Sequence, residues 1–261
     1  MKVATCRSSA LLPRNVSIAD LARAAGVSKT TVSHAFSGKR PVDPETRSRI
    51  EQLARQLGYR PNPAARQLRT GRAGVIALAS SMPLSISAGP SRLGFLMEIA
   101  ASAAVAALTQ GTALCLLPPL GAAGTPVDVA LDGVILVEPA QDDSLIGWFE
   151  GRHIPMISIG RVPGRPDLPH VDLRSGETAQ LVLEHLQAAG AARIGLVTGT
   201  ARRTSYLETE AAHEIFCASR AIPPVAIRLD EDAGQDGAAS ACRALLADHP
   251  ELDGLFVPVD A

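Results

Sequence analysis

The sequence predicts two structural classes in one chain, an all-α helix-turn-helix headpiece followed by a larger α/β domain built on parallel sheets. One observation is a division of charge: residues 1–72 hold 14 basic and 4 acidic residues, a net +10, whereas residues 73–261 carry −11. The other is a change of pattern, from short amphipathic helices to alternating apolar runs and helical stretches. A division of charge this strong indicates an N-terminal part that meets a polyanion.

The basic segment begins with a short helix whose ends are marked in the sequence. Ser17 is a favourable N-terminal cap, and Asp20 three positions later can complete a capping box. Gly26 ends the helix, because the turn that follows needs a positive φ. Four apolar residues recur between them at helical spacing and form one inward face: Ile18, Leu21, Ala22 and Ala25.

Two more helices are expected on the same grounds. Ser28 caps the second, and Asp43 opens the third with Pro44 at the position that needs no N–H donor. The inward residues of these two helices are expected to be Val32, Ala35 and Phe36, then Ile50, Leu53, Ala54 and Leu57. Three small apolar faces can share one core, and a helix, a glycine turn and a second helix form the helix-turn-helix arrangement.

The polar residues of the second helix are expected to point outward. They are Lys29, Thr30, Ser33 and His34. In a helix-turn-helix motif the N-terminal end of this helix enters the major groove of DNA, where short or flexible side chains hydrogen-bond to base edges. The alternative is an ordinary solvated helix face, and the +10 charge of the segment makes that interpretation the weaker one.

A further short helix is expected between Tyr59 and Arg72. Asn62 would cap it and Pro63 would take its first position. A helix well under about 12 residues is marginal in water, so it should form only when something supports it. Leu68 is its one large apolar residue and lies among Arg66, Arg69 and Arg72. This composition suits insertion into the DNA minor groove, with a flexible basic linker as the alternative.

One long stretch carries a family resemblance. It runs from Val16 to Arg72 and reads VSIADLARAAGVSKTTVSHAFSGKRPVDPETRSRIEQLARQLGYRPNPAARQLRTGR. It resembles the DNA-binding headpiece and hinge of the LacI/GalR family of bacterial repressors. The resemblance implies base-reading roles for Lys29, Thr30 and His34. The expected DNA-binding residues are Ser28, Lys29, Thr30, Thr31, Ser33, His34, Asn62, Ala65, Leu68 and Arg69.

His34 departs from the family pattern, which usually has arginine at this position. Arginine binds guanine through a bidentate fork, and histidine cannot copy that geometry. The operator is therefore expected to differ from the usual one at that base pair.

Strands and helices are expected to alternate after Arg72, which predicts parallel sheets covered by helices. The expected strands are Val75–Ala79, Ala113–Leu117, Gly133–Val137, Pro155–Ile159, Arg193–Val197, Val225–Arg228 and Gly254–Val257. The expected helices are Arg92–Gln110, Ser144–Gly151, Gly176–Ala189, Glu208–Ser219 and Gly237–Ala247. No G-x-G-x-x-G follows a strand and no Walker A sequence occurs, so no nucleotide cofactor is expected.

The resemblance, clearest over Val171–Gly199, implies a periplasmic-binding-protein-like effector domain with two sheet subdomains and a small ligand between them. In such sheets a ligand binds beyond the carboxyl ends of the strands. The expected effector-binding residues are Ser80, Arg161, Asp172 and Asp260. A carboxylate and a guanidinium can hold sugar hydroxyls or a purine edge. Leu173 and Ala191 depart from the family pattern, and the arginine usual near Thr209–Glu210 is absent, so the effector class stays open.

The expected organisation is a disordered lead-in (1–15), a DNA-binding domain (16–60), a hinge helix (61–72) and two effector subdomains (73–160 and 161–261). The second subdomain is expected to be incomplete, because family members continue through further strand–helix units. The expected partners are a near-palindromic double-stranded DNA operator, a small-molecule effector and a second copy of the chain. Four cysteines without paired spacing, no long apolar run and no signal-peptide core predict a cytoplasmic protein without a membrane partner.

Three alternatives stay open beside a sugar- or nucleoside-responsive repressor. An enzyme is the weakest, because the sequence has no G-x-S-x-G elbow, no Cys–His signature and no metal spacing among its six histidines. A sugar-binding receptor without a role on DNA would lack the headpiece and carry a signal peptide. The third is an operator-binding protein that has no working effector response.

Overall fold

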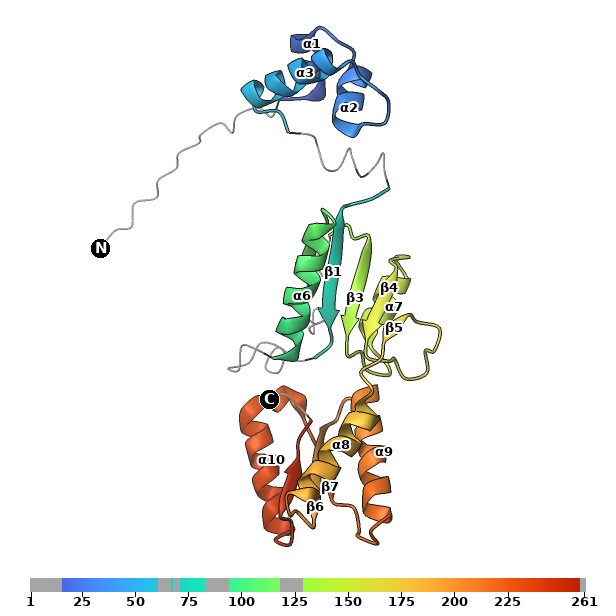
Figure 1. The fold of residues 1–261 in the computed structure, drawn as a ribbon, viewed down its shortest axis with the longest axis vertical. Helices are drawn as coiled ribbons and strands as arrows, with labels where there is room; N and C mark the ends of the chain where they lie inside the picture. Colours follow the sequence, from blue (N-terminus) through green and yellow to red (C-terminus); the bar gives the residue numbers. More distant parts are fainter. Residues whose placement is uncertain (1–15, 61–66, 68–70, 83–93, 118–128, 259–261) are drawn as a thin grey trace, which may run out of the picture. The chain divides into compact units, whose positions relative to one another are not determined.

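The computed structural model describes residues 16–60, 67, 71–82, 94–117 and 129–258. The chain divides into two compact units, Met1–Gly71 and Arg72–Ala261 (Figure 1). The expected lead-in (1–15) lies outside the described residues, as does the expected hinge helix (61–72) apart from residues 67, 71 and 72. The domain boundaries proposed from the sequence stay predictions.

The first unit contains the three predicted helices, α1 (Ile18–Ala25), α2 (Lys29–Ser37) and α3 (Pro44–Leu57). All three begin at the predicted caps, and α1 has the full capping box between Ser17 and Asp20. Each ends at a glycine in the left-handed region, which is strained for residues with a Cβ. Their shared core consists of Leu21, Ala22, Ala25, Val32, Ala35, Ile50 and Ala54.

Two residues predicted to lie in this core are exposed instead. Phe36 is 38% exposed and Leu57 is 40% exposed. Both belong to the last turn of their helix, beyond the level at which the three helices converge. Phe36 packs against Tyr59 at the rim, with 5.8 Å between the ring centroids. The core is therefore made mostly of small aliphatic side chains.

The second unit opens with a five-stranded parallel sheet in the order β2-β1-β3-β4-β5. The strands are β1 (Val75–Ser80), β2 (Ala113–Leu116), β3 (Gly133–Val137), β4 (Met156–Ile159) and β5 (His170–Val171). Helix α6 (Phe95–Thr109) packs on the face that includes Leu78, and α7 (Ser144–Glu150) packs on the face that includes Ala77 and Ala79. Alternate residues of β1 thus serve opposite faces, and both faces of the sheet are covered.

A three-stranded parallel sheet follows, in the order β7-β6-β8. Its strands are β6 (Ile194–Gly199), β7 (Ala226–Leu229) and β8 (Gly254–Phe256). Helices α8 (Ser175–Ala188) and α9 (Thr204–Ala218) cover one face around Ile194. The short η1 (Glu231–Ala233) leads into α10 (Gly234–Asp248), which packs around Val197 on the other face.

The predicted alternation of strands and helices is confirmed, and the differences lie at short or polar segments. The two-residue strand β5 and the helical turn η1 were not predicted, because each is too short to show a periodic pattern. Helix α9 begins at Thr204, whereas the predicted start was Glu208, because the polar first turn of the helix was assigned to a loop. No helix among the described residues is long and apolar enough to cross a membrane.

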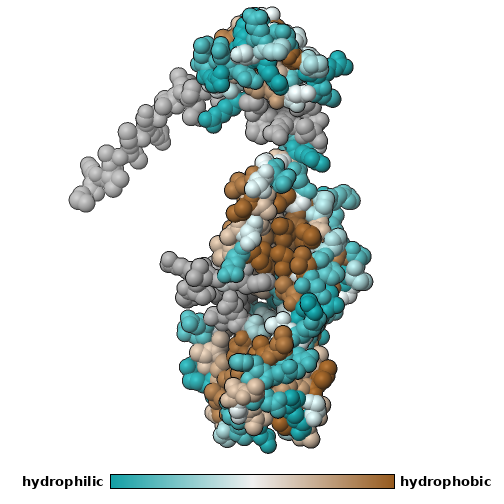
Figure 2. Space-filling model, viewed as in Figure 1, coloured by the Kyte–Doolittle hydropathy of each residue, from teal (hydrophilic) through white to brown (hydrophobic). Residues whose placement is uncertain are grey.

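Apolar side chains also appear on the surface of the second unit. Figure 2 shows hydrophobic residues gathered over the part of this unit around α6, and mostly polar residues over the helices of the first unit. On α6, Val105 is 64% exposed and Leu108 is 69% exposed, and on the neighbouring β2 Leu116 is 54% exposed. An exposed apolar surface of this kind is typical of a protein–protein contact.

Candidate functional site

The N-terminal turn of α2 presents the predicted DNA-reading face. The Ser28 hydroxyl accepts a hydrogen bond from the Thr31 backbone N–H at 3.0 Å, and the two hydroxyls lie 2.9 Å apart. Lys29 and Thr30 are exposed, whereas Thr31, Ser33 and His34 are half-buried. The first turn of α2 is thus capped, with a cationic and a hydroxyl side chain projecting into solvent.

The orientation of α2 is fixed from its inner side. Val32 and Ala35 are buried, at 0% and 2% exposure, against α1 and α3. Arg47 of α3 donates from Nε and Nη2 to the Ala35 carbonyl, at 3.0 and 2.8 Å. That carbonyl lies in the last turn of α2, where helix carbonyls lack partners within the helix. A guanidinium from α3 therefore ties down the end of α2 opposite the exposed turn.

Five predicted site residues lie outside the described residues and stay predictions. They are Asn62, Ala65, Leu68 and Arg69 of the expected hinge, and Asp260 of the expected effector site.

The carboxyl ends of β3 and β4 have unusual backbone conformations. Glu138, directly after β3, has φ of 48°, and Gly160, directly after β4, has φ of 87°. The Glu138 carboxylate lies where a side chain on Gly160 would begin, and the positive φ of residue 160 is strained for any residue with a Cβ. A non-glycine residue at positive φ is strained, and such strain is often found at functional sites. The Glu138 carboxylate is thus held in a defined place at the end of the first sheet.

Arg203, which follows β6 of the second sheet, extends to this same place. Its side chain is only 2% exposed. Nη1 donates to the Glu138 carbonyl and to Ser81 Oγ, the latter at 3.3 Å. Nε lies 3.6 Å from Glu231 Oε1, an ion pair with a residue that follows β7. A single guanidinium thus has partners after β1 and β3 of one sheet and after β7 of the other.

Two residues in the first turn of α9 complete this group. Ser205 donates through its hydroxyl to Glu138 Oε2, and Tyr206 donates to Glu231 Oε1 at 2.8 Å. We call the five residues the Arg203 cluster: Glu138, Arg203, Ser205, Tyr206 and Glu231.

Burial is the main cause of the shifted pKa values of two members of this cluster, Glu138 and Tyr206. It raises the pKa of Glu138 above its usual value, and the Ser205 hydrogen bond and the Arg203 charge oppose that shift without reversing it. Burial, together with the neighbouring Glu231 carboxylate, raises the pKa of Tyr206, so the phenol stays a hydrogen-bond donor.

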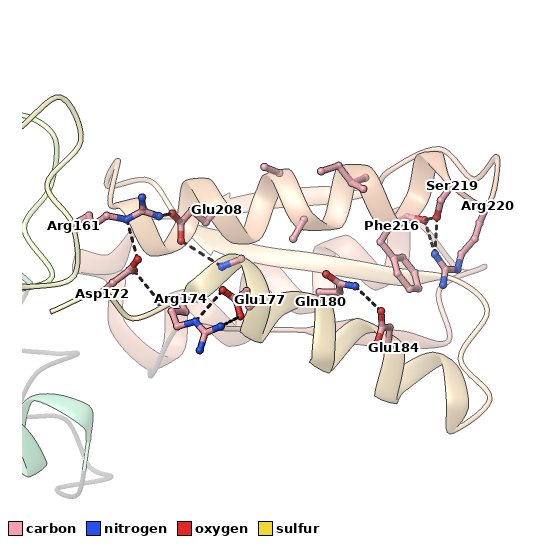
Figure 3. A pocket seen from close by; sticks show the side chains of 14 residues that line it. Arg161, Asp172, Arg174, Glu177, Gln180, Glu184, Glu208, Phe216, Ser219 and Arg220 are labelled. Carbon is pink, nitrogen blue, oxygen red and sulfur yellow. Dashed lines mark hydrogen bonds and ion pairs between the residues drawn. The ribbon is translucent and has the colours of Figure 1, made fainter. Parts of the chain in front are cut away.

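Arg161 and Asp172, both predicted for the effector site, are brought together by the fold. Arg161 Nε lies 3.5 Å from Asp172 Oδ2, and its guanidinium also pairs with Glu208 of α9. The other oxygen of Glu208 accepts a weak 3.4 Å hydrogen bond from the Gly176 N–H in the first turn of α8. These residues line one end of a 620 Å³ groove between α8 and α9, whose far end is lined by Phe216 and Arg220 (Figure 3).

Ser80 is held differently from this pair. Its hydroxyl donates to the Val137 carbonyl at 2.9 Å and accepts from the Met82 N–H at 3.2 Å, and its side chain is buried. Both of these contacts are internal to the ends of β1 and β3. It is the next residue, Ser81, that contacts the Arg203 cluster.

Sequence reasoning did not single out most of the polar residues at this junction. Glu138 was visible as a strand end, but Arg203, Glu208 and Glu231 gave no signal, because arginine and glutamate are almost always exposed unless paired. Their partners lie far away in the sequence: Arg203 is 65 residues from Glu138. Among the described residues no group of three His, Cys, Asp or Glu side chains could hold a metal ion.

Comparison with known proteins places the first unit in a family. The family model of bacterial regulatory proteins of the lacI family matches residues 17–62. The chain is 33% identical over 196 residues to the HTH-type transcriptional regulator AglR of Rhizobium meliloti, covering 70% of this chain and 52% of that protein. It is 26% identical over 253 residues to the HTH-type transcriptional regulator CelR of Thermobifida fusca, covering 92% and 72%.

A third relative, an HTH-type transcriptional regulator of Mycolicibacterium smegmatis, is 29% identical over 192 residues, covering 71% of this chain and 52% of that protein. The chain therefore spans about half the length of two of these three curated relatives. All three are regulators rather than enzymes by name.

Solved structures show the same fold at low sequence identity. A lac repressor dimer bound to operator and the anti-inducer ONPF matches with a TM-score of 0.72 and 21% identity, covering 94% of this chain and 74% of that one. A CelR–cellobiose complex matches with a TM-score of 0.57 and 22% identity, covering 93% and 74%. The helix-turn-helix domain, residues 17–62, therefore belongs to the lacI family of bacterial regulatory proteins, and the rest of the chain is similar to regulators that carry such a domain.

Proposed function

We propose that this protein is a sequence-specific DNA-binding repressor that acts in the cytoplasm as a homodimer and responds to a small molecule held by its second unit. The observation that carries the proposal is the first turn of α2. It is capped by Ser28, exposes Lys29 and Thr30, and belongs to a segment of net charge +10. Such a turn fits the major groove, where lysine and threonine hydrogen-bond to base edges.

The proposed base-reading residues are Lys29, Thr30 and His34, and Ser28, Thr31 and Ser33 beside them would contact phosphates or neighbouring bases. The proposed hinge adds Asn62, Ala65, Leu68 and Arg69 in the minor groove, with Leu68 as a wedge between base pairs. In a dimer, two such reading helices would meet the two halves of a near-palindromic operator.

The proposed effector is sugar-like. Two of the similar structures hold small molecules by their titles, the sugar cellobiose on CelR and the anti-inducer ONPF on the lac repressor. In this chain Arg161 and Asp172 form an ion pair after β4 and β5, beyond the carboxyl ends of parallel strands. A carboxylate and a guanidinium so placed can share the hydroxyls of a sugar, and Ser80 and Asp260 would complete the site. A nucleoside-like effector would use the same groups on a purine edge.

The proposed homodimer has support in the exposed apolar residues of α6. Val105 and Leu108 project from this helix beside Leu116 of β2. Burial of side chains of this size would stabilise contact with a second copy by about 25 cal/mol for each Å² of apolar surface removed from water.

Selection of DNA from a random library tests the first half of the proposal. We expect the full chain to enrich one near-palindromic site, and Thr30→Ala to relax the choice at one or two base pairs in each half-site. Ser37→Ala, at the other end of α2, is the matched control and should select the wild-type site. Enrichment of no site by the wild-type chain would contradict the proposal.

A ligand-shift melting screen tests the second half. The wild-type chain is melted with a panel of mono- and disaccharides and nucleosides, and then again with Asp172→Asn. We expect one sugar to raise the melting temperature of the wild type but not of the variant. A shift by nucleosides alone would change the effector class, and no shift with any compound would favour an operator-binding protein without an effector response.

A further inference from the structure

The segment that leads into α9 is joined directly to the loop after β3. Ala140 and Arg203 form an antiparallel β-bridge outside the two sheets. The Gln141 N–H donates to the Arg202 carbonyl at 3.0 Å. Because β3 belongs to the first sheet and α9 follows β6 of the second, these backbone contacts link the two halves of the second unit.

Side chains of the same segment add further links. The Thr204 hydroxyl donates to the Arg161 carbonyl at 2.6 Å, and Ser205 donates to the Glu138 carboxylate. Thr204, Ser205 and the Arg203 guanidinium thus each contact the end of β3 or β4, in a run of three consecutive residues. The first turn of α9 is fitted to the carboxyl ends of the first sheet.

Arg203 is the centre of this junction because its buried guanidinium contacts groups from both halves of the second unit. Its side chain is 2% exposed and that of Glu231 is 5% exposed. The guanidinium is planar and its donors are arranged in a rigid fork, so it can satisfy partners in several fixed directions at once. Here those partners are the Glu138 carbonyl and Ser81 of one half and the Glu231 carboxylate of the other.

Such a contact is specific without being permanent. A buried ion pair gains little net free energy, because the charges lose water when they come together and regain it when they separate. Separation of the two halves would therefore expose Arg203 to water at modest cost, whereas closing them restores one defined set of partners. An element with these properties can hold one arrangement and still be displaced.

We propose that Arg203 is an internal clamp that holds the two halves of the second unit together in the arrangement seen here. The clamp occupies the carboxyl ends of the strands, which is also where the proposed function places the effector. The regulatory consequence of the clamp therefore rests on the proposed function. An effector that needs this space must displace Arg203. Its apparent affinity is then the intrinsic affinity multiplied by the fraction of molecules in which Arg203 has left the space.

Hydrogen exchange of the full chain, without DNA or ligand, tests the clamp. We compare the wild type with Arg203→Met, which keeps an unbranched apolar stem but removes the charge and the hydrogen-bond donors, and with Arg193→Met, at an exposed arginine just before β6, as a matched control. The clamp predicts exchange about tenfold faster in R203M for peptides that cover residues 138–143 and 200–207. Peptides from α10 and from the first unit should be unchanged, and R193M should match the wild type at residues 138–143 and 200–207.

Two outcomes would overturn the clamp. One is wild-type exchange at 138–143 in a folded R203M. The other is uniformly faster exchange across the whole second unit in both R203M and Arg203→Lys, which would make Arg203 an ordinary part of the core. Should R203M fail to fold, R203K alone decides, because lysine keeps the charge and loses only the planar fork of donors. Faster exchange in R203K confined to residues 138–143 and 200–207 supports the clamp. Exchange equal to that of the wild type at these residues rejects it. Failure of the DNA-selection experiment leaves this result unaffected, because the exchange measurement uses neither operator nor effector.

Discussion

Position 34 is where a single side chain should have the clearest effect on operator choice. His34 lies half-buried on α2, one helical turn after the exposed Thr30. It has at most two ring nitrogens to offer a base, whereas arginine offers a bidentate fork to guanine. The identity of this residue is therefore expected to set the preference at one base pair of each half-site.

We predict that His34→Arg shifts the preferred base at that pair toward guanine by about 1–3 kcal/mol. The measurement is competition binding with operators that differ only at the pair in question. Gln52→Arg, on the exposed side of α3, adds the same charge elsewhere and should strengthen binding to all operators alike. Equal strengthening by both variants, without a change of base preference, would show that residue 34 does not read the pair.

Glu138 should give the second unit a pH dependence of its own. Burial raises its pKa in the folded state above the ordinary 4.5, so the folded protein holds the proton more tightly than the unfolded chain does. The contribution of Glu138 to stability is therefore constant below about pH 4.5. It decreases as the pH rises through the raised pKa, because ionisation then favours the unfolded chain.

We predict that Glu138→Gln removes this decrease, so the free energy of unfolding of the variant rises relative to the wild type between pH 4.5 and 8. Urea melts of both proteins across this range measure the difference. Glu98→Gln on the exposed side of α6 controls for the loss of a carboxylate. A difference between E138Q and wild type that does not vary with pH would contradict the prediction.

At the scale of the element, α1 shows how hydrogen bonds between residues close in the sequence stabilise the start of a helix. Ser17 accepts from the Asp20 N–H at 3.2 Å, and the Asp20 carboxylate accepts from the Ser17 N–H at 3.1 Å. These contacts satisfy backbone donors that an eight-residue helix leaves unpaired at its start. They involve residues three apart, which explains why the sequence alone predicted this cap.

We predict that Ser17→Ala lowers the stability of the helix-turn-helix domain by about 1 kcal/mol, since the cap is lost while the core is kept. Thermal melts of the full chain, followed through the transition of the first unit, give the value. Gln52→Ala on the exposed side of α3 should leave that transition nearly unchanged. A loss no greater for S17A than for Q52A would mean that packing alone holds α1 in place.

Larger errors of sequence reasoning also appear at the scale of the element. Helix α9 begins at Thr204, within a stretch rich in polar residues that gives no apolar periodicity. Its first turn is stabilised by distant partners, through Thr204 to Arg161 and Ser205 to Glu138. The prediction that Phe36 is buried was wrong for a related reason. The apolar pattern shows which face of a helix points inward, but it does not show how far along that face the neighbouring helices extend.

For the whole molecule, the division of charge should govern association with DNA. Residues 1–72 carry +10 and the remainder carries −11, so the chain has almost no net charge. Binding to DNA releases counterions in proportion to the phosphates that the basic segment neutralises. A near-zero total charge therefore does not imply weak electrostatics.

We predict that the logarithm of operator affinity falls linearly and steeply with the logarithm of salt concentration, by about 0.9 for each phosphate neutralised. Titrations between low and physiological salt measure the slope. Replacing Lys39 and Arg40 together by glutamine should reduce it if both contact phosphates, and Arg152→Gln in the acidic part should not. A nearly flat plot for the wild type would contradict the electrostatic account.

The sequence by itself determined the features that depend on neighbours within about one helical turn or on the alternation along a strand. These include the caps at Ser17, Ser28 and Asp43, the glycine ends of three helices, and the strands that alternate with helices after residue 72. The exposure of Lys29 and Thr30 follows from the same periodicity, because Val32 and Ala35 occupy the inner face.

Only the tertiary structure decided how the ends of the strands meet. The pairing of Arg161 with Asp172 needed β4 and β5 to lie side by side, and the Arg203 cluster needed three strands from two sheets to end at one place. A buried arginine is stable only when its partners are already positioned, and these partners come from residues 81, 138 and 231. No local pattern records contacts between residues so far apart, so their chemistry becomes visible only once the chain has folded.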